Sequence, residues 1–202
     1  MGEVARILRV GGHPAVDFAN TLGGSPSNAD DEYLHDYTDL LDWALGGGLL
    51  DRQVTEALRS AAAREAAHAD EVFHAALDLR ANLDAVLRAH LSDRSVTAAD
   101  REALRDAYAA AVARADLVPR EDLYAWSWSG ADLERPLWPV AHHAVDLLRE
   151  GPLSRLARCE HCRWLYLDTS KNRSRRWCSM AACGAVVKMR RYRANRRSPD
   201  AS

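Results

Sequence analysis

Hydrophobic and polar positions follow a helical period along most of the first 150 residues. Between residues 51 and 91, apolar side chains recur every three or four positions in an Ala-rich background, which predicts one or two long amphipathic helices. Three further helices are predicted on similar grounds: residues 37–45, which a run of three glycines ends, residues 97–115, which begin at a capping threonine, and residues 137–149.

Two segments depart from this period. Residues 123–129 alternate large and small side chains, which predicts a strand, paired in a hairpin with residues 115–118. Residues 4–22 predict a short strand, a turn at the glycines and then a short helix or extended segment. The expected fold class is therefore α+β: a mainly helical N-terminal body with a small β-sheet, followed by a different kind of module at the C-terminus.

Charge is sorted along the chain, although the formal net charge is only −2. Residues 1–150 contain 14 Arg and 26 Asp plus Glu, a balance of −12, whereas residues 151–202 contain 13 Lys plus Arg and 3 acidic residues, a balance of +10. The break at Gly151-Pro152 predicts two domains, an acidic body (1–150) and a basic tail (151–202). Nucleic acid is the commonest polyanion that such a tail would meet.

The four cysteines of the chain all lie in the tail, at Cys159, Cys162, Cys178 and Cys183. Their spacing, Cys-x2-Cys-x15-Cys-x4-Cys, supplies two thiolate pairs, as one tetrahedral Zn²⁺ requires; a disulfide or redox role is the alternative. Four thiolates leave no open position, so the zinc is expected to be structural rather than catalytic. His161 is the alternative ligand, although its place inside the first Cys pair favours a supporting or exposed role.

The tail also predicts a fold for this metal site. A knuckle at residues 159–162, a hairpin of strands 164–167 and 175–177, and a helix from near Ser179 follow one another, as in a treble-clef-like zinc finger with four cysteine ligands. The N-terminus carries no long apolar segment and no stretch is apolar enough to span a membrane, so we expect a soluble, cytoplasmic protein with no membrane partner.

Basic residues form two clusters on the predicted finger, one in the hairpin and one on the helix. Such clusters suit phosphate contacts with nucleic acid, whereas a solvated helix end, favoured by the helix dipole, is the alternative for the second cluster. The candidate nucleic-acid-binding residues are Lys171, Arg173, Arg175, Arg176, Lys188, Arg190, Arg191 and Arg193.

The tail, C-E-H-C-R-W-L-Y-L-D-T-S-K-N-R-S-R-R-W-C-S-M-A-A-C-G … K-M-R-R-Y-R, resembles the CGNR zinc finger, and the opening G-G-H-P-A-V-D-F-A-N-T-L resembles the start of the ABATE domain. Proteins with this architecture are regarded as bacterial transcription regulators whose finger binds DNA, so the resemblance implies the same here. One departure stands out: the family motif Cys-Gly-Asn-Arg reads Cys183-Gly184-Ala185-Val186 in this chain.

The predicted function is a non-enzymatic transcription regulator that binds DNA through the basic zinc module, with the body as sensor and dimerisation domain. Three polar residues of the opening segment, His13, Asp17 and Asn20, are candidates for a small-molecule effector pocket; a turn in which they bond to the backbone is the alternative. The rival prediction is an RNA-binding or protein-interaction module whose finger docks on an acidic surface. No nucleophile, base and oxyanion group occur at a readable spacing, so no catalytic residue is predicted.

Overall fold

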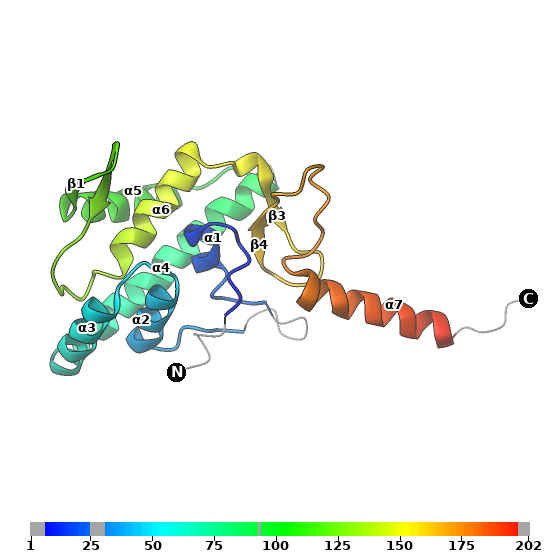
Figure 1. Ribbon diagram of the computed structural model, residues 1–202, viewed down its shortest axis with the longest axis horizontal. Helices are drawn as coiled ribbons and strands as arrows, with labels where there is room; N and C mark the ends of the chain where they lie inside the picture. The colour runs from blue at the N-terminus through cyan, green and yellow to red at the C-terminus, as the bar shows by residue number, and fades with distance from the viewer. Residues whose placement is uncertain (1–6, 25–30, 93, 198–202) are drawn as a thin grey trace, which may run out of the picture.

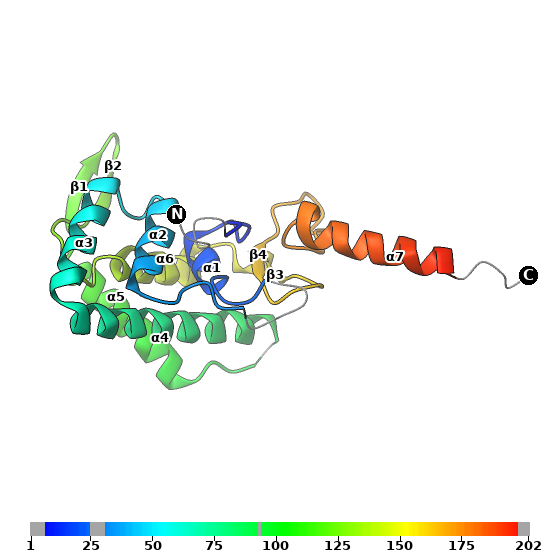
Figure 2. The same ribbon diagram turned by 90° about the horizontal axis from the view of Figure 1, so that it is seen from below.

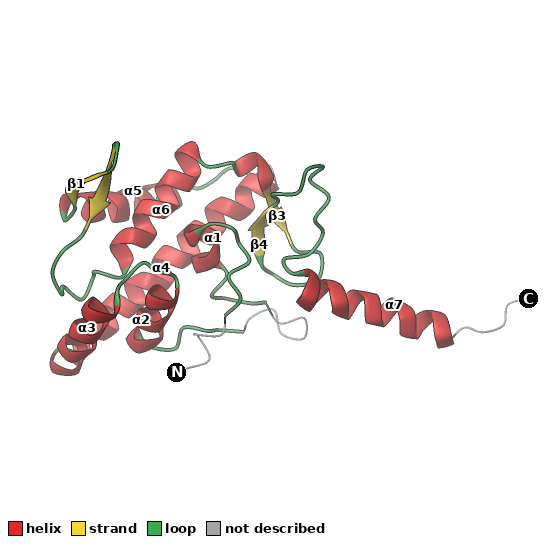
Figure 3. Cartoon of the chain, in the orientation of Figure 1, coloured by secondary structure: helices red, strands yellow, loops and turns green. Residues whose placement is uncertain are grey.

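Helices dominate the computed structural model, which describes residues 7–24, 31–92 and 94–197 (Figures 1 and 3). The body comprises α1 (Pro14–Ala19), α2 (Tyr37–Gly46), α3 (Arg52–Arg64), α4 (Ala66–Leu91), α5 (Ala98–Ala113), the strands β1 (Asp116–Arg120) and β2 (Leu123–Ser127), and α6 (Leu137–Glu150). The tail comprises a 3-10 turn (Leu153–Arg155), β3 (Leu156–Arg158), β4 (Leu165–Leu167), a π-helical turn (Met180–Gly184) and α7 (Ala185–Arg197). The expected α+β class, mainly helical with small sheets, is confirmed.

Local sequence signals explain where the body helices begin. The side chains of Asp36, Asp51 and Thr97 accept the backbone N–H three residues ahead, at 2.8, 2.8 and 3.1 Å, and so cap α2, α3 and α5. The long amphipathic stretch is two helices, because the chain leaves helical geometry at Glu65 before α4 starts. The helices predicted from periodicity are therefore confirmed to within a few residues.

The short helix α1 lies at the centre of the body. It packs against α4 and α6, and its residues Val16 and Phe18 are fully buried. The Phe18 ring lies 5.1 Å from the ring of Trp43 on α2, centroid to centroid. Pro14 at the first helical position needs no N–H partner and presets the helical φ, which helps so short a helix to start. The opening segment thus contributes the middle of the hydrophobic core.

Each sheet has two antiparallel strands. β1 pairs with β2 from Asp116 opposite Ser127 onward, so the predicted body hairpin is confirmed. In the tail, β3 pairs with β4, with Leu156 opposite Leu167. The predicted pairing of residues 164–167 with 175–177 is therefore wrong, and residues 7–10 form no strand either, while residues 4–6 lie outside the described part of the chain.

Side chains explain why residues 175–177 form no strand. The backbone N–H of Arg175 donates to the carboxylate of Asp168 at 3.0 Å, and the Tyr166 hydroxyl donates to the Arg175 carbonyl. Because side chains bind both the N–H and the carbonyl of Arg175, these backbone groups cannot form a strand pairing with β4.

The tail divides into a part that packs on the body and a part that leaves it. Leu156, Leu165 and Leu167 of the β3–β4 hairpin belong to the same apolar core as the body helices. By contrast, α7 extends away from the rest of the molecule in both views of Figures 1 and 2. Among the described residues, no helix is both long and apolar enough to cross a membrane.

Candidate metal centre

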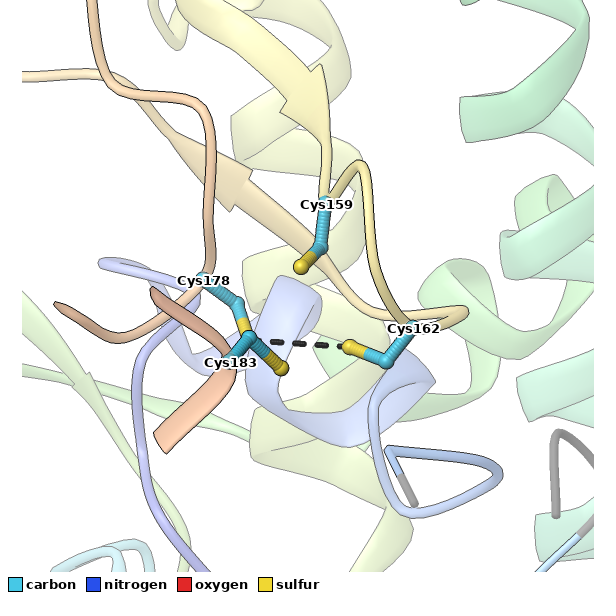
Figure 4. A group of neighbouring side chains, drawn as sticks. All are labelled: Cys159, Cys162, Cys178 and Cys183. Atoms are coloured by element: carbon cyan, nitrogen blue, oxygen red, sulfur yellow. Dashed lines mark hydrogen bonds between the residues drawn. The ribbon is translucent and has the colours of Figure 1, made fainter. Parts of the chain in front are cut away.

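The four cysteine sulfurs converge on one point (Figure 4). All four Sγ atoms lie within 4.8 Å of one another, and the Cys162–Cys178 and Cys178–Cys183 Sγ distances are both 3.6 Å. Four sulfurs bound tetrahedrally at the usual zinc distance of about 2.3 Å would be about 3.8 Å apart. All four cysteines are free thiols. The spacing of the sulfurs therefore suits one tetrahedral zinc ion.

Two structural devices bring these sulfurs together. Cys159 follows β3 directly and Cys162 lies in the turn before β4, and the Cys159 N–H donates to the Trp164 carbonyl at 2.9 Å to close this knuckle. Cys183 lies in the π-helical turn ahead of α7, and Ser179 caps that turn, because its hydroxyl accepts the Ala182 N–H at 3.2 Å. The first cysteine pair is thus fixed by a hairpin and the second by a helix start.

The four neighbouring thiols shift one another's pKa values. Hydrogen bonds from Cys162 and Cys178 hold the pKa of Cys159 far below that of an ordinary thiol, while the bond to Cys159 raises the pKa of Cys162 to about 12 and also raises the pKa of Cys178. Cys159, Cys178 and Cys183 are at most 2% exposed. Buried thiols that cannot all ionise alone suit a divalent cation, which binds thiolates and releases their protons.

The alternative ligand, His161, stands apart from this group. The set of metal-ligating atoms within 4.8 Å of one another contains the four sulfurs and no imidazole nitrogen. Nε2 of His161 is buried and has no hydrogen-bond partner among the described residues. Four sulfurs complete a tetrahedral site, so His161 lies beside the ligand set rather than in it.

A buried amide on the body holds the finger in place. Nδ2 of Asn20 donates to the Leu165 carbonyl and Oδ1 accepts the Leu165 N–H, both at 2.8 Å, and Asn20 is only 2% exposed. The Leu167 N–H donates to the Gly11 carbonyl at 2.8 Å. In an antiparallel pair alternate residues point their backbone groups outward. The body therefore supplies hydrogen-bond partners for the backbone groups on the outer edge of β4, as a third strand would.

An ion-pair network makes a second joint between body and finger. Asp84 of α4 accepts from Arg88 at 2.7 Å and from Arg163, next to Cys162, at 2.9 Å. Arg88 also donates to the Arg163 carbonyl at 3.0 Å. Sequence reasoning missed Asp84, Arg163 and the role of Asn20, because their partners are 75 to 145 positions away along the chain.

The predicted nucleic-acid residues fall into two groups. Those of α7 (Lys188, Arg190, Arg191 and Arg193) are exposed, and no hydrogen bond or ion pair engages them within the described chain, as is also true of Lys171. Those of the loop are engaged: Arg173 donates to the Ser154 carbonyl at 3.3 Å and Arg176 pairs with Glu160 at 2.7 Å. Arg175 donates to the carbonyls of Trp177, Val10 and Cys178 and lies over the Tyr166 ring.

The three predicted effector residues lie close in sequence but face different partners. Asp17 accepts the Gly11 N–H at 2.8 Å, and Asn20 is bonded to Leu165 as described. His13 caps α1, and its ring contacts that of His143 at a centroid distance of 5.7 Å. Burial lowers the pKa of both histidines, which favours neutral rings. The structure thus gives Asp17 and Asn20 backbone partners, and the effector role stays a prediction.

Comparison with known families agrees with this geometry. Residues 12–151 match the family model ABATE, described as "Putative stress-induced transcription regulator", and residues 155–196 match the model of the CGNR zinc finger. No curated protein matches the chain. The finger match and the four converging sulfurs together assign one structural zinc ion to the tail. The division of the chain at residue 150 stays a prediction.

Proposed function

The chain belongs to the ABATE family and carries a CGNR zinc finger, and from this premise we propose that it regulates transcription by binding DNA through its basic finger, with the helical body as sensor. Neither family is a family of enzymes by its description. The proposal places the protein in the cytoplasm, where it would meet DNA.

The observation that carries this proposal is the exposure of the basic residues on α7. Six of the thirteen residues of α7 are Lys or Arg, and the helix extends away from the acidic body in both views (Figures 1 and 2). A helix of this length is about 20 Å long. That length and its diameter suit the major groove of DNA, which is about 12 Å wide and admits an α-helix.

The residues of the finger take different roles in this proposal. The cysteines fix the finger, and Arg175 stabilises its loop, because three carbonyls and the Tyr166 ring already occupy its guanidinium. Arg173 and Arg176 add charge near the same loop. Phosphate contacts are assigned to the five unengaged cations, Lys171, Lys188, Arg190, Arg191 and Arg193.

The departure from the family motif affects specificity more than folding. Ala185 and Val186, which replace the motif's Asn and Arg, are both exposed on the first turn of α7. Gly184, which the motif keeps, is buried, and a Cβ there would lie 2.6 Å from Sδ of Met180. The two missing side chains are thus not needed to build the finger. We expect binding dominated by phosphate contacts, which carry little sequence information.

Fluorescence anisotropy with a random DNA duplex of about 25 base pairs tests the proposal, since backbone binding depends steeply on salt. If all five unengaged cations contact phosphates, a plot of log K against log salt has a slope of about −4.5. A strong chelator should abolish binding by removing the zinc that fixes the finger. Absence of binding by the zinc-loaded chain at low salt would refute the DNA-binding function.

Two added arms test the rival function. An RNA duplex and a single-stranded RNA of the same length distinguish RNA from DNA, since tighter binding to either RNA would favour the RNA-binding module. Light scattering of the complex counts the chains bound and so tests the predicted homodimer.

A further inference from the structure

A cavity of about 540 Å³ lies where the end of α4 meets β3 of the finger. Its lining residues are Arg88, Leu91, Ser92, Arg94 and Arg158. The volume falls in the usual range of small-ligand sites, about 300–1,000 Å³. Three of the five lining residues are arginines, and none of the five is acidic.

The positive charge of this cavity is only partly compensated. Arg94 and Arg158 are exposed, and neither has a carboxylate partner within the described chain. Arg88 shares the single carboxylate of Asp84 with Arg163, so one negative charge serves two guanidinium groups. Asp93, between Ser92 and Arg94 in the sequence, lies outside the described residues.

We propose that this cavity binds a phosphate group through Arg94 and Arg158, and that Arg88 adds positive charge to the same lining. A guanidinium fork matches phosphate oxygens in a bidentate way and stays charged, so arginine is the usual residue at such sites. Ser92 takes no part, because its hydroxyl already donates to the Arg88 carbonyl at 2.8 Å. Among the described residues that line the cavity, the arginines thus define an anion site with no acidic residue to repel the ligand.

The site also joins the two parts of the chain. Arg94 belongs to the body, whereas Arg158 ends β3 and directly precedes the zinc-ligating Cys159. A phosphate bound by both arginines would therefore hold the finger against the body, next to the joint formed by Asp84 and Arg163. The phosphate can come from the DNA backbone or from a free phosphorylated compound. Only the first source rests on the proposed function.

A double variant, Arg94→Ala with Arg158→Ala, tests the site in the zinc-loaded full chain. The matched control is Arg52→Ala with Arg120→Ala, because both of these arginines are exposed and unpaired within the described residues and lie on α3 and β1, at the other end of the body from β3 (Figure 1). Zinc content and far-UV circular dichroism confirm that both double variants fold. Should the alanine variant fail to fold, Arg94→Gln with Arg158→Gln replaces it.

The first arm measures binding of inorganic pyrophosphate by calorimetry at constant ionic strength. The second measures the salt dependence of DNA binding. If the two arginines contact a phosphate, the double variant loses at least about tenfold in affinity, as expected for charged hydrogen bonds. If that phosphate belongs to DNA, the slope of log K against log salt falls by about 1.8, or 0.9 for each contact.

Each outcome decides the proposal. A loss for pyrophosphate alone identifies a free phosphorylated compound as the ligand, and a loss for DNA alone identifies the DNA backbone. If the wild type fails to bind DNA but binds pyrophosphate, the proposed function fails while the anion site stands. Behaviour of the double variant equal to that of the control in both arms overturns the site, as does a wild type that binds neither probe.

Discussion

Replacement of Asn20 by alanine should remove the hydrogen bonds that join β4 of the finger to the body at Leu165. The change removes two hydrogen bonds of 2.8 Å to the backbone of Leu165, a residue that is fully buried. Each bond contributes about 1 kcal/mol net, and each backbone group left buried without a partner costs about 1–3 kcal/mol. Relaxation and water entry recover part of this cost. We therefore expect a loss of about 3 kcal/mol in the free energy of unfolding.

Urea unfolding followed by tryptophan fluorescence measures this loss, and zinc release to a coloured chelator measures the effect on the finger. For a chain of this size, about 3 kcal/mol corresponds to a fall of about 6–12 °C in Tm. The expected result is a lower midpoint for both probes, because zinc binding depends on a folded finger.

Two further variants separate hydrogen bonding from packing. Asn20→Asp preserves the volume but loses the donor and sets a carboxylate oxygen against the Leu165 carbonyl, so it should destabilise the protein at least as much as alanine does. Asn172→Ala is the control, since this asparagine is exposed in the finger loop and its side chain makes no hydrogen bond within the described residues. A loss below about 0.5 kcal/mol for Asn20→Ala, equal to the control, would refute the assigned role of the amide.

Three further changes would test the zinc ligands, the Arg80 ion pair and the departure from the family motif. Cys162→Ser should release the zinc and unfold the tail while the body keeps its far-UV circular dichroism; a variant with full zinc content would contradict the ligand assignment. Glu32→Gln should cost about 3–5 kcal/mol, because it leaves Arg80, only 6% exposed, without its carboxylate. Burial alone would raise the pKa of Glu32, but the hydrogen bonds from Arg80 lower it below the ordinary value of 4.5. The stabilisation from this ion pair is therefore fully present above pH 4.5 and is lost as the pH falls through the lower pKa of the folded state. Urea titrations of the wild type and the variant at several pH values measure this loss. Ala185→Asn with Val186→Arg should raise DNA affinity in anisotropy titrations and leave the zinc content unchanged, since both positions are exposed.

Local signals were sufficient to predict much of the fold and the metal ligands. The helices follow from periodicity and from caps such as Thr97, which are properties of a few neighbouring residues. The four cysteines could be predicted as ligands because zinc-binding pairs are close in sequence. These features do not depend on knowledge of which distant segments meet.

The partner of β4 could not be predicted in the same way. Residues 175–177 have the composition of a returning strand, but Asp168 and Tyr166 bond the backbone of Arg175, and the true partner, β3, precedes the knuckle. The effector role of the polar residues near the glycines stays a prediction, and the structure adds that Asp17 and Asn20 bond to backbone groups. Side-chain bonds to the backbone of Arg175 decided the strand pairing, and no sequence pattern marks them.

The joint between body and finger would couple zinc binding to the proposed sensor role of the body. α1 supplies Asn20 at its end, α4 supplies Asp84, and both contact residues within three positions of Cys162. β4 has partners on both edges, β3 on one and the body on the other, and the Cys159–Cys162 knuckle connects β3 to β4. A ligand that strengthens these contacts therefore raises zinc affinity, and by linkage zinc raises affinity for that ligand by the same factor. A sensor built on α1 or α4 would thus act on the finger through its metal-bound knuckle, with no need to contact α7.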